Sequence, residues 1–180
     1  PLHLTKHIDA IVINAGDGAR EHPTQAILDM TSLHEKFGYL KGLKIGIIGD
    51  ISHSRVALSN IHGLKTMGAE VTLCGPATLI PPHAEELGVN VNYNLDEVIK
   101  WADALNVLRI QRERMSGGLL PSVREYRNLF GITPERLANQ KKELVIMHPG
   151  PMNRGVEIDL SLIHISEPTR RTPMSYAVFC

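Results

Sequence analysis

Four short segments of this sequence carry side chains that could bind and activate an anionic substrate. They are His22-Pro23-Thr24-Gln25, Arg55, Arg109-Ile110-Gln111 and His148-Pro149-Gly150-Pro151. An arginine guanidinium matches a carboxylate or a phosphate with paired hydrogen bonds, and a glutamine amide both donates and accepts. No run of acidic residues accompanies these segments, so we interpret them as parts of one pocket for an anion.

His22 and Gln25 lie one helical turn apart at a predicted helix start, so their side chains face the same way. The free N–H groups of a helix start suit a phosphate or a carbonyl oxygen. Histidine can donate to a developing oxyanion. His22 alone would be interpreted as a helix-capping residue, but within the segment 21–25, which follows Gly16-Asp17-Gly18, we favour a functional role.

Arg55 follows the most apolar predicted strand, at the place where a dinucleotide-binding fold carries Gly-x-Gly-x-x-Gly. Those glycines are absent, which argues against a nicotinamide or flavin enzyme. A cation in the first turn of a helix is disfavoured by the helix dipole. A carboxylate ligand therefore explains Arg55 better than a surface role does.

Arg109 and Gln111 leave a predicted strand as alternate residues, so both side chains can reach one carboxylate. The segment 148–151 has two prolines that fix the backbone around a glycine, which can orient peptide carbonyls toward an N–H group. For His148 alone we favour a plain rigid turn. Arg154 stays open between a substrate contact and a salt bridge.

The elements that must position these segments alternate between strand and helix along the chain. We predict strands at 8–14, 43–50, 70–74, 89–93, 104–108 and 143–147 and helices at 23–34, 52–67, 82–88, 96–102, 122–130 and 134–139. This alternation predicts an α/β fold with a doubly wound, Rossmann-like parallel sheet and helices on both faces. Ligands bind at the carboxyl ends of the strands in such sheets, where three of the four segments lie.

Composition excludes several classes of function. The chain has 180 residues, with 19 basic and 19 acidic side chains, so no net charge attracts nucleic acid or an anionic membrane. Two cysteines make no disulfide framework, and no apolar run suits a membrane span or a signal peptide. The nine histidines show no metal-ligand spacing with a third ligand. We expect a cytoplasmic protein without metal or cofactor.

The chemistry-bearing segments together resemble the aspartate carbamoyltransferases, within the aspartate/ornithine carbamoyltransferase family. The resemblance covers about residues 8–159 and rests on 12–18, 22–25, 49–50 with 53–55, 108–111 with 113–114, and 148–155. Ornithine enzymes usually have a cysteine where this chain has Gly150, and the Arg-x-Gln motif also favours aspartate. The resemblance implies transfer of the carbamoyl group from carbamoyl phosphate to the amine of L-aspartate, a step of pyrimidine biosynthesis.

By this resemblance, His22 polarises the carbamoyl carbonyl, Gln25 holds the carbamoyl group, and the backbone of Gly150 and Pro151 contacts carbamoyl phosphate. No covalent intermediate and no cofactor are expected, since positioning and charge stabilisation suffice.

On the aspartate side, the resemblance implies that Arg55 and Arg109 bind the two carboxylates and that Gln111 supports the Arg109 loop. It further implies a homotrimer, with a regulatory chain as a possible partner.

The resemblance also predicts how the chain is divided. Residues 1–21 would be a remnant of an N-terminal carbamoyl-phosphate domain and its linker, and 22–159 the aspartate-binding domain. Residues 160–180 resemble a translated sequencing-adapter read-through, so we expect a non-native tail. The family's Ser-Thr-Arg-Thr phosphate segment is absent, so we expect little or no turnover from this chain.

Two alternatives remain. One is an ornithine-type or other carbamoyltransferase, which a diamine rather than a dicarboxylate would protect. The other is a non-catalytic binding or regulatory domain of the same fold, against which the full set of site residues argues, because a scaffold needs none of them.

Overall fold

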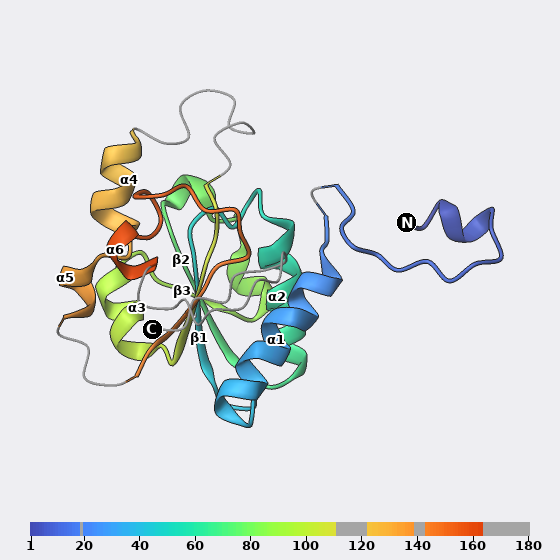
Figure 1. Ribbon diagram of the computed structural model, residues 1–180, viewed down its shortest axis with the longest axis horizontal. Coiled ribbons are helices and arrows are strands. Elements are labelled where there is room, and N and C mark those ends of the chain that lie inside the picture. The colour runs from blue at the N-terminus through green and yellow to red at the C-terminus, as the bar shows by residue number, and fades with distance from the viewer. Residues whose placement is uncertain (19, 111–121, 139–142, 164–180) are drawn as a thin grey trace.

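A five-stranded parallel sheet forms the centre of the molecule, as the sequence predicts (Figure 1). The computed structural model describes residues 1–18, 20–110, 122–138 and 143–163. The strands are β1 (Lys44–Ile48), β2 (Glu70–Cys74), β3 (Asn90–Val91), β4 (Ala104–Val107) and β5 (Val145–Met147). Their order is β3-β2-β1-β4-β5, so the chain builds outward from β1 in one direction and then returns to its other side. The switch between β1 and β4 is where such sheets bind ligands.

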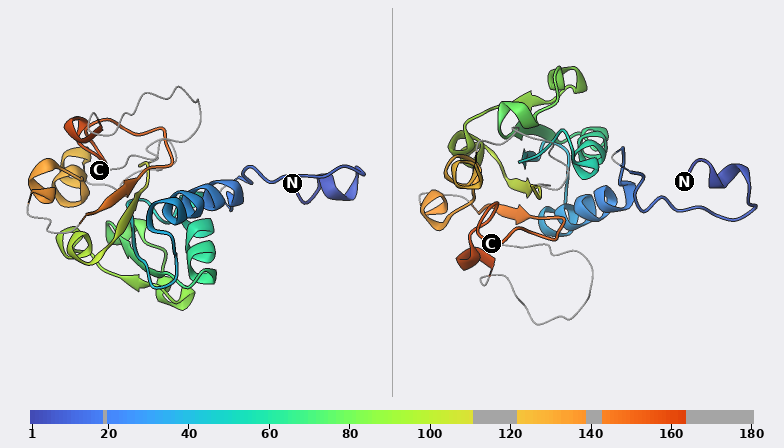
Figure 2. Two further views of the ribbon diagram at one scale, coloured as in Figure 1. Left: turned by 60° about the horizontal axis from the view of Figure 1, so that its bottom comes forward. Right: turned by 90° about the horizontal axis from the view of Figure 1, so that it is seen from above.

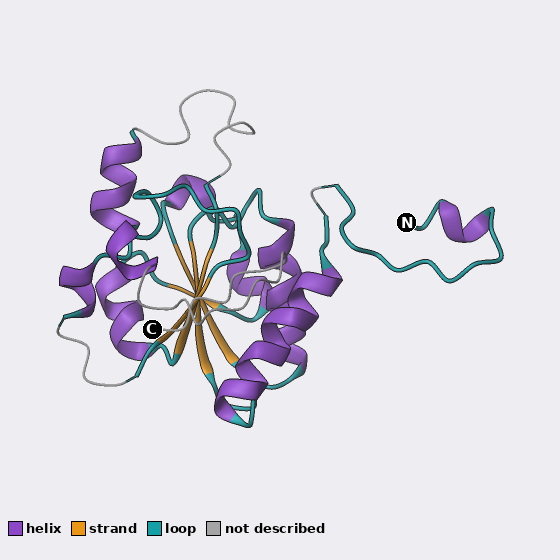
Figure 3. Ribbon diagram, in the orientation of Figure 1, coloured by secondary structure: helices purple, strands orange, loops and turns teal. Residues whose placement is uncertain are grey.

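Helices cover both faces of the sheet (Figure 3). On one face lie α1 (Pro23–Phe37) and α2 (Arg55–Thr66), and on the other α3 (Leu95–Trp101) and α4 (Val123–Phe130). The short helices are α5 (Pro134–Leu137), α6 (Leu160–Ile163) and the 3-10 turns η1 (Leu4–Lys6), η2 (Ala77–Leu79) and η3 (Ala84–Leu87). Because β1 is covered on both sides, it is a continuous apolar run rather than an alternating one.

Two apolar clusters fill the space between the sheet and its helices. Leu33 of α1 and Ile61 of α2 pack with Ile45 and Ile47 of β1 on one face. The cluster on the other face includes Ile48, Val98 of α3 and Tyr126 of α4. The alternation of Ile47 and Ile48 between the two clusters follows from the two-residue period of a strand.

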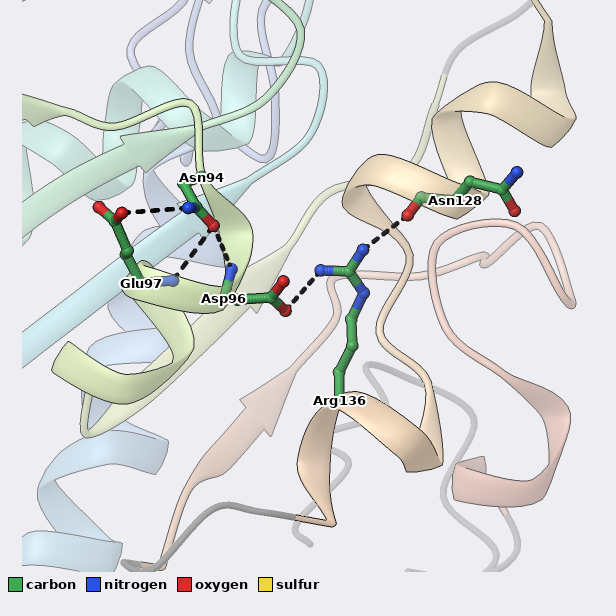
Figure 4. Close-up of polar contacts among 5 residues, drawn as sticks. All are labelled: Asn94, Asp96, Glu97, Asn128 and Arg136. Carbon is green, nitrogen blue, oxygen red and sulfur yellow. Dashed lines mark hydrogen bonds and ion pairs between the residues drawn. The ribbon is translucent and has the colours of Figure 1, made fainter.

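Polar contacts join α3, α4 and α5 at the surface (Figure 4). Asn94 caps α3 by accepting from the backbone N–H groups of Asp96 and Glu97, at 3.1 and 3.4 Å. Arg136 of α5 donates to Oδ1 of Asp96 and to the backbone oxygen of Asn128, each at 2.6 Å. One guanidinium therefore ties the start of α3 to the last turns of α4.

The predicted strand at 8–14 is wrong. These residues form no strand, and Ile11 and Ile13 are 95% and 75% exposed. Residues 1–18 and 20–21 extend away from the sheet (Figures 1 and 2). An apolar run becomes a strand only when a neighbouring strand accepts its backbone hydrogen bonds and a layer covers its side chains. No described part of the chain does this for 8–14.

The other predicted elements are confirmed as helices or strands, with one change of type. The segment at 82–88 is the 3-10 turn η3 rather than an α-helix. The chain enters η3 through His83, which has a φ of 59°, and leaves it at Gly88, which has a φ of 71°. Because a residue with left-handed backbone angles interrupts the helix at each end, only one tight turn forms between them.

The predicted division at residues 22 and 160 stays a prediction. α1 begins next to the first boundary, at Pro23. Beyond the second, Leu162 of α6 is 5% exposed and packs in the same cluster as Tyr126. The rest of the expected tail, 164–180, lies outside the described residues.

Candidate functional site

One polar pocket of about 210 Å³ brings most of the predicted site residues together. It lies where β1, β4 and β5 end and α1 and α2 begin. Its lining residues are His22, Gln25, Ser54, Arg55, Val56, Arg109, Pro149, Gly150 and Pro151. Six of the seven predicted site residues are among them, and the seventh, Gln111, lies outside the described residues. None of these lining residues is acidic, so the lining carries net positive charge.

His22 lies at the N-cap position of α1, but its side chain makes no capping hydrogen bond. Its backbone N–H donates to Oγ of Ser59 at 2.8 Å, which ties the start of α1 to α2. Burial, and then the nearby Arg55 cation, lower the pKa of His22 below its ordinary value of 6.5. The imidazole is therefore neutral at pH 7. Oγ1 of Thr24 lies 3.3 Å from its Nδ1, and if this hydroxyl donates, the ring proton sits on Nε2.

Gln25 is held by a buried carboxylate one turn further along α1. Its Nε2 donates to Oδ1 of Asp29 at 2.8 Å. Oδ2 of Asp29 accepts from the amides of Asn60 on α2 and Asn106 on β4, at 2.7 and 2.9 Å. Burial raises the pKa of Asp29 above 3.8, and the three amide hydrogen bonds oppose that rise. The network joins α1, α2 and the sheet directly behind the pocket.

Arg55 is the first residue of α2, whose N-cap is Ser54, as its position after β1 predicts. Nη1 of Arg55 donates to the backbone oxygen of Gly18 at 3.2 Å. Gly16 has a φ of 132°, and a Cβ there would lie 2.8 Å from the same Nη1. Only glycine allows the chain to turn and to pass this close to the guanidinium. Residues 16–18 therefore help to fix Arg55.

The loop that carries Arg109 is fixed by a second buried carboxylate, Glu157. Its Oε1 accepts from the backbone N–H of Ile110 at 2.8 Å, and its Oε2 from that of Asn153 at 2.9 Å. Nδ2 of Asn153 donates to Oε1 of Glu157 at 2.6 Å and to the backbone oxygen of Ile110 at 2.9 Å. Burial raises the pKa of Glu157 above 4.5. Glu157 thus joins the loop after β4 to the loop after β5.

The segment 148–151 forms a rigid turn, as predicted. Nδ1 of His148 accepts from the N–H of Gly150 at 2.9 Å, the Gly150–Pro151 peptide is cis, and Gly150 has a φ of 59°. Burial, and then the cation of Arg109, lower the pKa of His148 to about 4. His148 therefore acts as a neutral acceptor within the turn. Arg154 is exposed and is not one of the pocket residues.

Sequence reasoning missed two kinds of functional residue. Ser54, Val56 and Pro149 also line the pocket, and each is the direct sequence neighbour of a predicted site residue. Asp29 and Glu157 stand behind the pocket and do not line it. The spacing of Gln25 and Asp29, four residues along a predicted helix, could have indicated their contact. No comparable signal in the sequence connects Glu157 with Ile110.

Other parts of the described chain offer fewer groups that could bind or activate a substrate. A hollow of about 260 Å³ is lined by Ile27, Met30, Thr31, His34, Leu40 and Met67, which offer no charged pair for a substrate. Among the described residues, no group of three or more histidine, cysteine, aspartate and glutamate side chains could hold a metal ion. The polar pocket is therefore the better candidate site.

Fold and site define a doubly wound α/β protein with a cationic pocket at the switch of its sheet. The family model for the Asp/Orn binding domain of aspartate/ornithine carbamoyltransferases matches residues 41–168. The chain belongs to this family, which confirms the resemblance found in the sequence.

Relatives with curated names indicate which branch of the family this chain resembles. The aspartate carbamoyltransferase catalytic subunit of Moorella thermoacetica is 60% identical over 158 residues, which is 88% of this chain and 52% of that protein. The same subunit of Chlorobium phaeovibrioides is 62% identical over 147 residues, 82% of this chain and 47% of that protein. The chain thus spans about half the length of the curated relatives it matches.

Solved structures show the same fold. Aspartate transcarbamoylase from Trypanosoma cruzi in complex with carbamoyl phosphate has a TM-score of 0.78 at 29% identity, over 88% of this chain and 53% of that one. The same enzyme in complex with N-(phosphonacetyl)-L-aspartic acid has a TM-score of 0.71 at 32% identity, over 83% and 50%. In the described part of this chain, no helix has the length and apolar character to cross a membrane.

Proposed function

We propose that the whole protein from which this chain comes is an aspartate carbamoyltransferase, and that this chain supplies its aspartate-binding half. The observation that carries the proposal is the convergence of Arg55 and Arg109 with His22 and Gln25 on one pocket. Two guanidinium groups suit a substrate with two carboxylates, and a neutral imidazole beside an amide suits a carbamoyl group. The name shared by the curated relatives supports the same reaction.

In the proposed reaction, the amine of L-aspartate attacks the carbonyl carbon of carbamoyl phosphate. The new C–N bond forms as the C–O bond to phosphate breaks, the phosphate leaves with that electron pair, and the amine loses a proton. His22 would donate from Nε2 to the carbonyl oxygen as it gains negative charge. Gln25 would bind the carbamoyl amide, and the backbone at Gly150 and Pro151 would hold carbamoyl phosphate against it.

The two arginines would orient the second substrate. Arg55 and Arg109 would each bind one carboxylate of L-aspartate, which places the amine toward the carbamoyl carbon. Gln111 would support the Arg109 loop. Holding both reactants in this geometry makes the attack effectively unimolecular, so no covalent intermediate or cofactor is needed.

The division of the chain is part of the proposal. Residues 22–159 would be the aspartate-binding domain and 1–21 the remnant of a carbamoyl-phosphate domain, with a non-native tail from residue 160. A phosphate site in that other domain would explain why the pocket offers only two arginines. We therefore expect little or no turnover from the 180-residue chain, and carbamoyl aspartate formed at a family-like rate would contradict this.

The finer assignments follow from the family resemblance. The whole protein would be a cytoplasmic homotrimer that acts in pyrimidine biosynthesis, with a regulatory chain as a possible further partner. Sedimentation of the full-length protein would measure the oligomeric state directly.

The central experiment is a calorimetric titration of the 180-residue chain with N-(phosphonacetyl)-L-aspartate, succinate and ornithine. We expect the two dicarboxylates to bind, Arg109→Ala to abolish that binding, and the exposed-residue control Lys100→Ala to leave it unchanged. Binding of ornithine instead would indicate the ornithine-type alternative. A folded chain that binds none of the three would contradict an aspartate site that works without its partner domain.

A further inference from the structure

Asp29 does not line the pocket, yet its carboxylate accepts a hydrogen bond from Gln25, which does. Its oxygens accept from three side-chain amides, those of Gln25, Asn60 and Asn106, at 2.7 to 2.9 Å. The side chain is buried, with Asp29 7% exposed. An ionised carboxylate has only acceptor sites, so each amide must turn its NH2 group toward it.

The two asparagines both turn their NH2 groups toward Asp29. Oδ1 of Asn60 and Oδ1 of Asn106 are buried and have no hydrogen-bond partner among the described residues. A buried amide oxygen without a partner costs free energy. Both amides nevertheless keep NH2 toward Asp29, so the carboxylate decides their orientation and not the surroundings of their oxygens.

The same constraint acts on Gln25, with a consequence for the pocket. Because Nε2 is directed to Asp29, the acceptor Oε1 is left for a ligand, and no hydrogen bond within the described part of the chain uses it. A glutamine without such a neighbour could present either end, since the two ends have nearly the same shape.

We propose that Asp29 is a positioning residue that fixes the Gln25 amide with its acceptor toward the pocket, so that the site selects a ligand bearing N–H at that point. The proposal rests on the proposed function, because it explains how the site distinguishes a carbamoyl group from an acyl group of the same shape. Asn60 and Asn106 hold Asp29 in place from α2 and β4.

An exchange of partners tests the contact without using activity. In Gln25→Glu, two carboxylates meet at pH 8 and repel. In Gln25→Glu/Asp29→Asn, the new amide at position 29 donates to the new carboxylate at position 25, while its oxygen still accepts from Asn60 and Asn106. We expect the urea midpoint of unfolding to fall in the single variant and to recover in the double variant. Gln25→Glu/Glu35→Gln, which removes an exposed carboxylate from the same helix, should not recover.

A pair of probes of equal shape and charge tests the selection. Phosphonoacetamide carries an NH2 group where 2-oxopropylphosphonate carries a methyl group. We expect wild type to prefer the amide by about fivefold, as one hydrogen bond allows. At pH 8 the preference should fall toward one in Asp29→Asn, whose new amide lets Gln25 turn its NH2 group toward the pocket, and it should return in Gln25→Glu/Asp29→Asn, where position 25 carries only acceptors. A merely structural role for Asp29 would weaken both probes equally.

The two measurements separate the proposals. If wild type binds neither probe, the proposed selection fails for this chain, whereas the titration with dicarboxylates tests the proposed function separately, and the urea midpoints still decide whether Asp29 holds Gln25. If the double variant recovers no stability, or if Glu35→Gln rescues equally well, Asp29 does not position Gln25. Recovered stability without recovered preference would overturn the selection.

Discussion

Two buried carboxylates hold segments that line the pocket, and they differ in the groups they bind. Asp29 accepts only from side-chain amides, those of Gln25, Asn60 and Asn106. Glu157 accepts from the backbone N–H groups of Ile110 and Asn153, as well as from the Asn153 side chain. Burial raises the pKa of both groups. Their burial is similar, so the difference lies in their partners.

Side-chain amides can rotate to suit a new neighbour, whereas backbone N–H groups keep the direction that the fold gives them. A substitution of Asp29 can therefore be accommodated by rotation of the neighbouring amides. Its main effect should be on whether Gln25 turns its oxygen or its NH2 group toward the pocket. A change at Glu157 leaves fixed donors without an acceptor, so it should affect the shape of two loops. The predictions below test this contrast.

The largest effect should come from Glu157→Gln. Its new NH2 group must face one of the two backbone N–H groups, those of Ile110 and Asn153, which cannot turn away. Loss of a charged acceptor and one unsatisfied buried donor together cost about 4 kcal/mol. Urea unfolding measures this cost, and Glu70→Gln at an exposed position of β2 is the matched control. A loss under about 1 kcal/mol would contradict the fixed-donor argument.

The second effect is a pH dependence from His148, which lies in the loop after β5 that Glu157 also contacts. The pKa of His148 is about 4 in the fold against an ordinary 6.5. As the pH falls below 6.5, the unfolded chain takes up a proton that the folded chain refuses until about pH 4. Stability should therefore fall by about 3 kcal/mol over that window.

The two carboxylates act in the opposite direction. Asp29 and Glu157 have raised pKa values in the folded chain, so the folded chain binds these protons at a higher pH than the unfolded chain does. Protonation of these two carboxylates therefore stabilises the fold as the pH falls. His148→Gln should remove most of the loss and leave this gain together with the smaller loss from His22, whose pKa is also lowered, whereas His62→Gln at an exposed position of α2 should leave the loss unchanged. Urea midpoints at pH 7 and pH 4.5 would show whether His148→Gln lacks most of the loss. The same fall in both variants would exclude His148 as its source.

Asp29→Asn should cost about 1 kcal/mol or less. An asparagine keeps one acceptor and gains one donor, and its amide neighbours can turn to match it. Thermal unfolding beside Glu35→Gln measures the difference. A cost as large as that of Glu157→Gln would remove the contrast between rotating and fixed partners.

The smallest effect is expected at the surface contact of Asp96 with Arg136 (Figure 4). The Asp96 side chain is 58% exposed, so water screens the ion pair. Asp96→Asn should cost under about 0.5 kcal/mol. A loss above about 2 kcal/mol in urea unfolding would show that this contact does more than an exposed ion pair does.

The sequence by itself determined the order of elements and most of the pocket. Apolar runs such as 43–50 can be buried on both faces only in a covered parallel sheet, and parallel strands bring their carboxyl ends to one edge. Arg55, Arg109 and Gly150 follow such ends, so their convergence was predictable. These are consequences of local pattern and of a topology with few alternatives.

Tertiary structure alone decided the rest. Ile11 and Ile13 have the pattern of a buried strand, yet they are exposed, because a strand needs partners that a pattern cannot supply. In the sequence, Asp29 has no feature that distinguishes it from other helix residues. Only the folded chain shows that Asn106, 77 residues away, donates to it. Glu157 likewise meets Ile110 over 47 residues. Hydrogen bonds between distant segments depend on how the layers pack, and this is why the residues that hold the pocket in shape were found only in the folded chain.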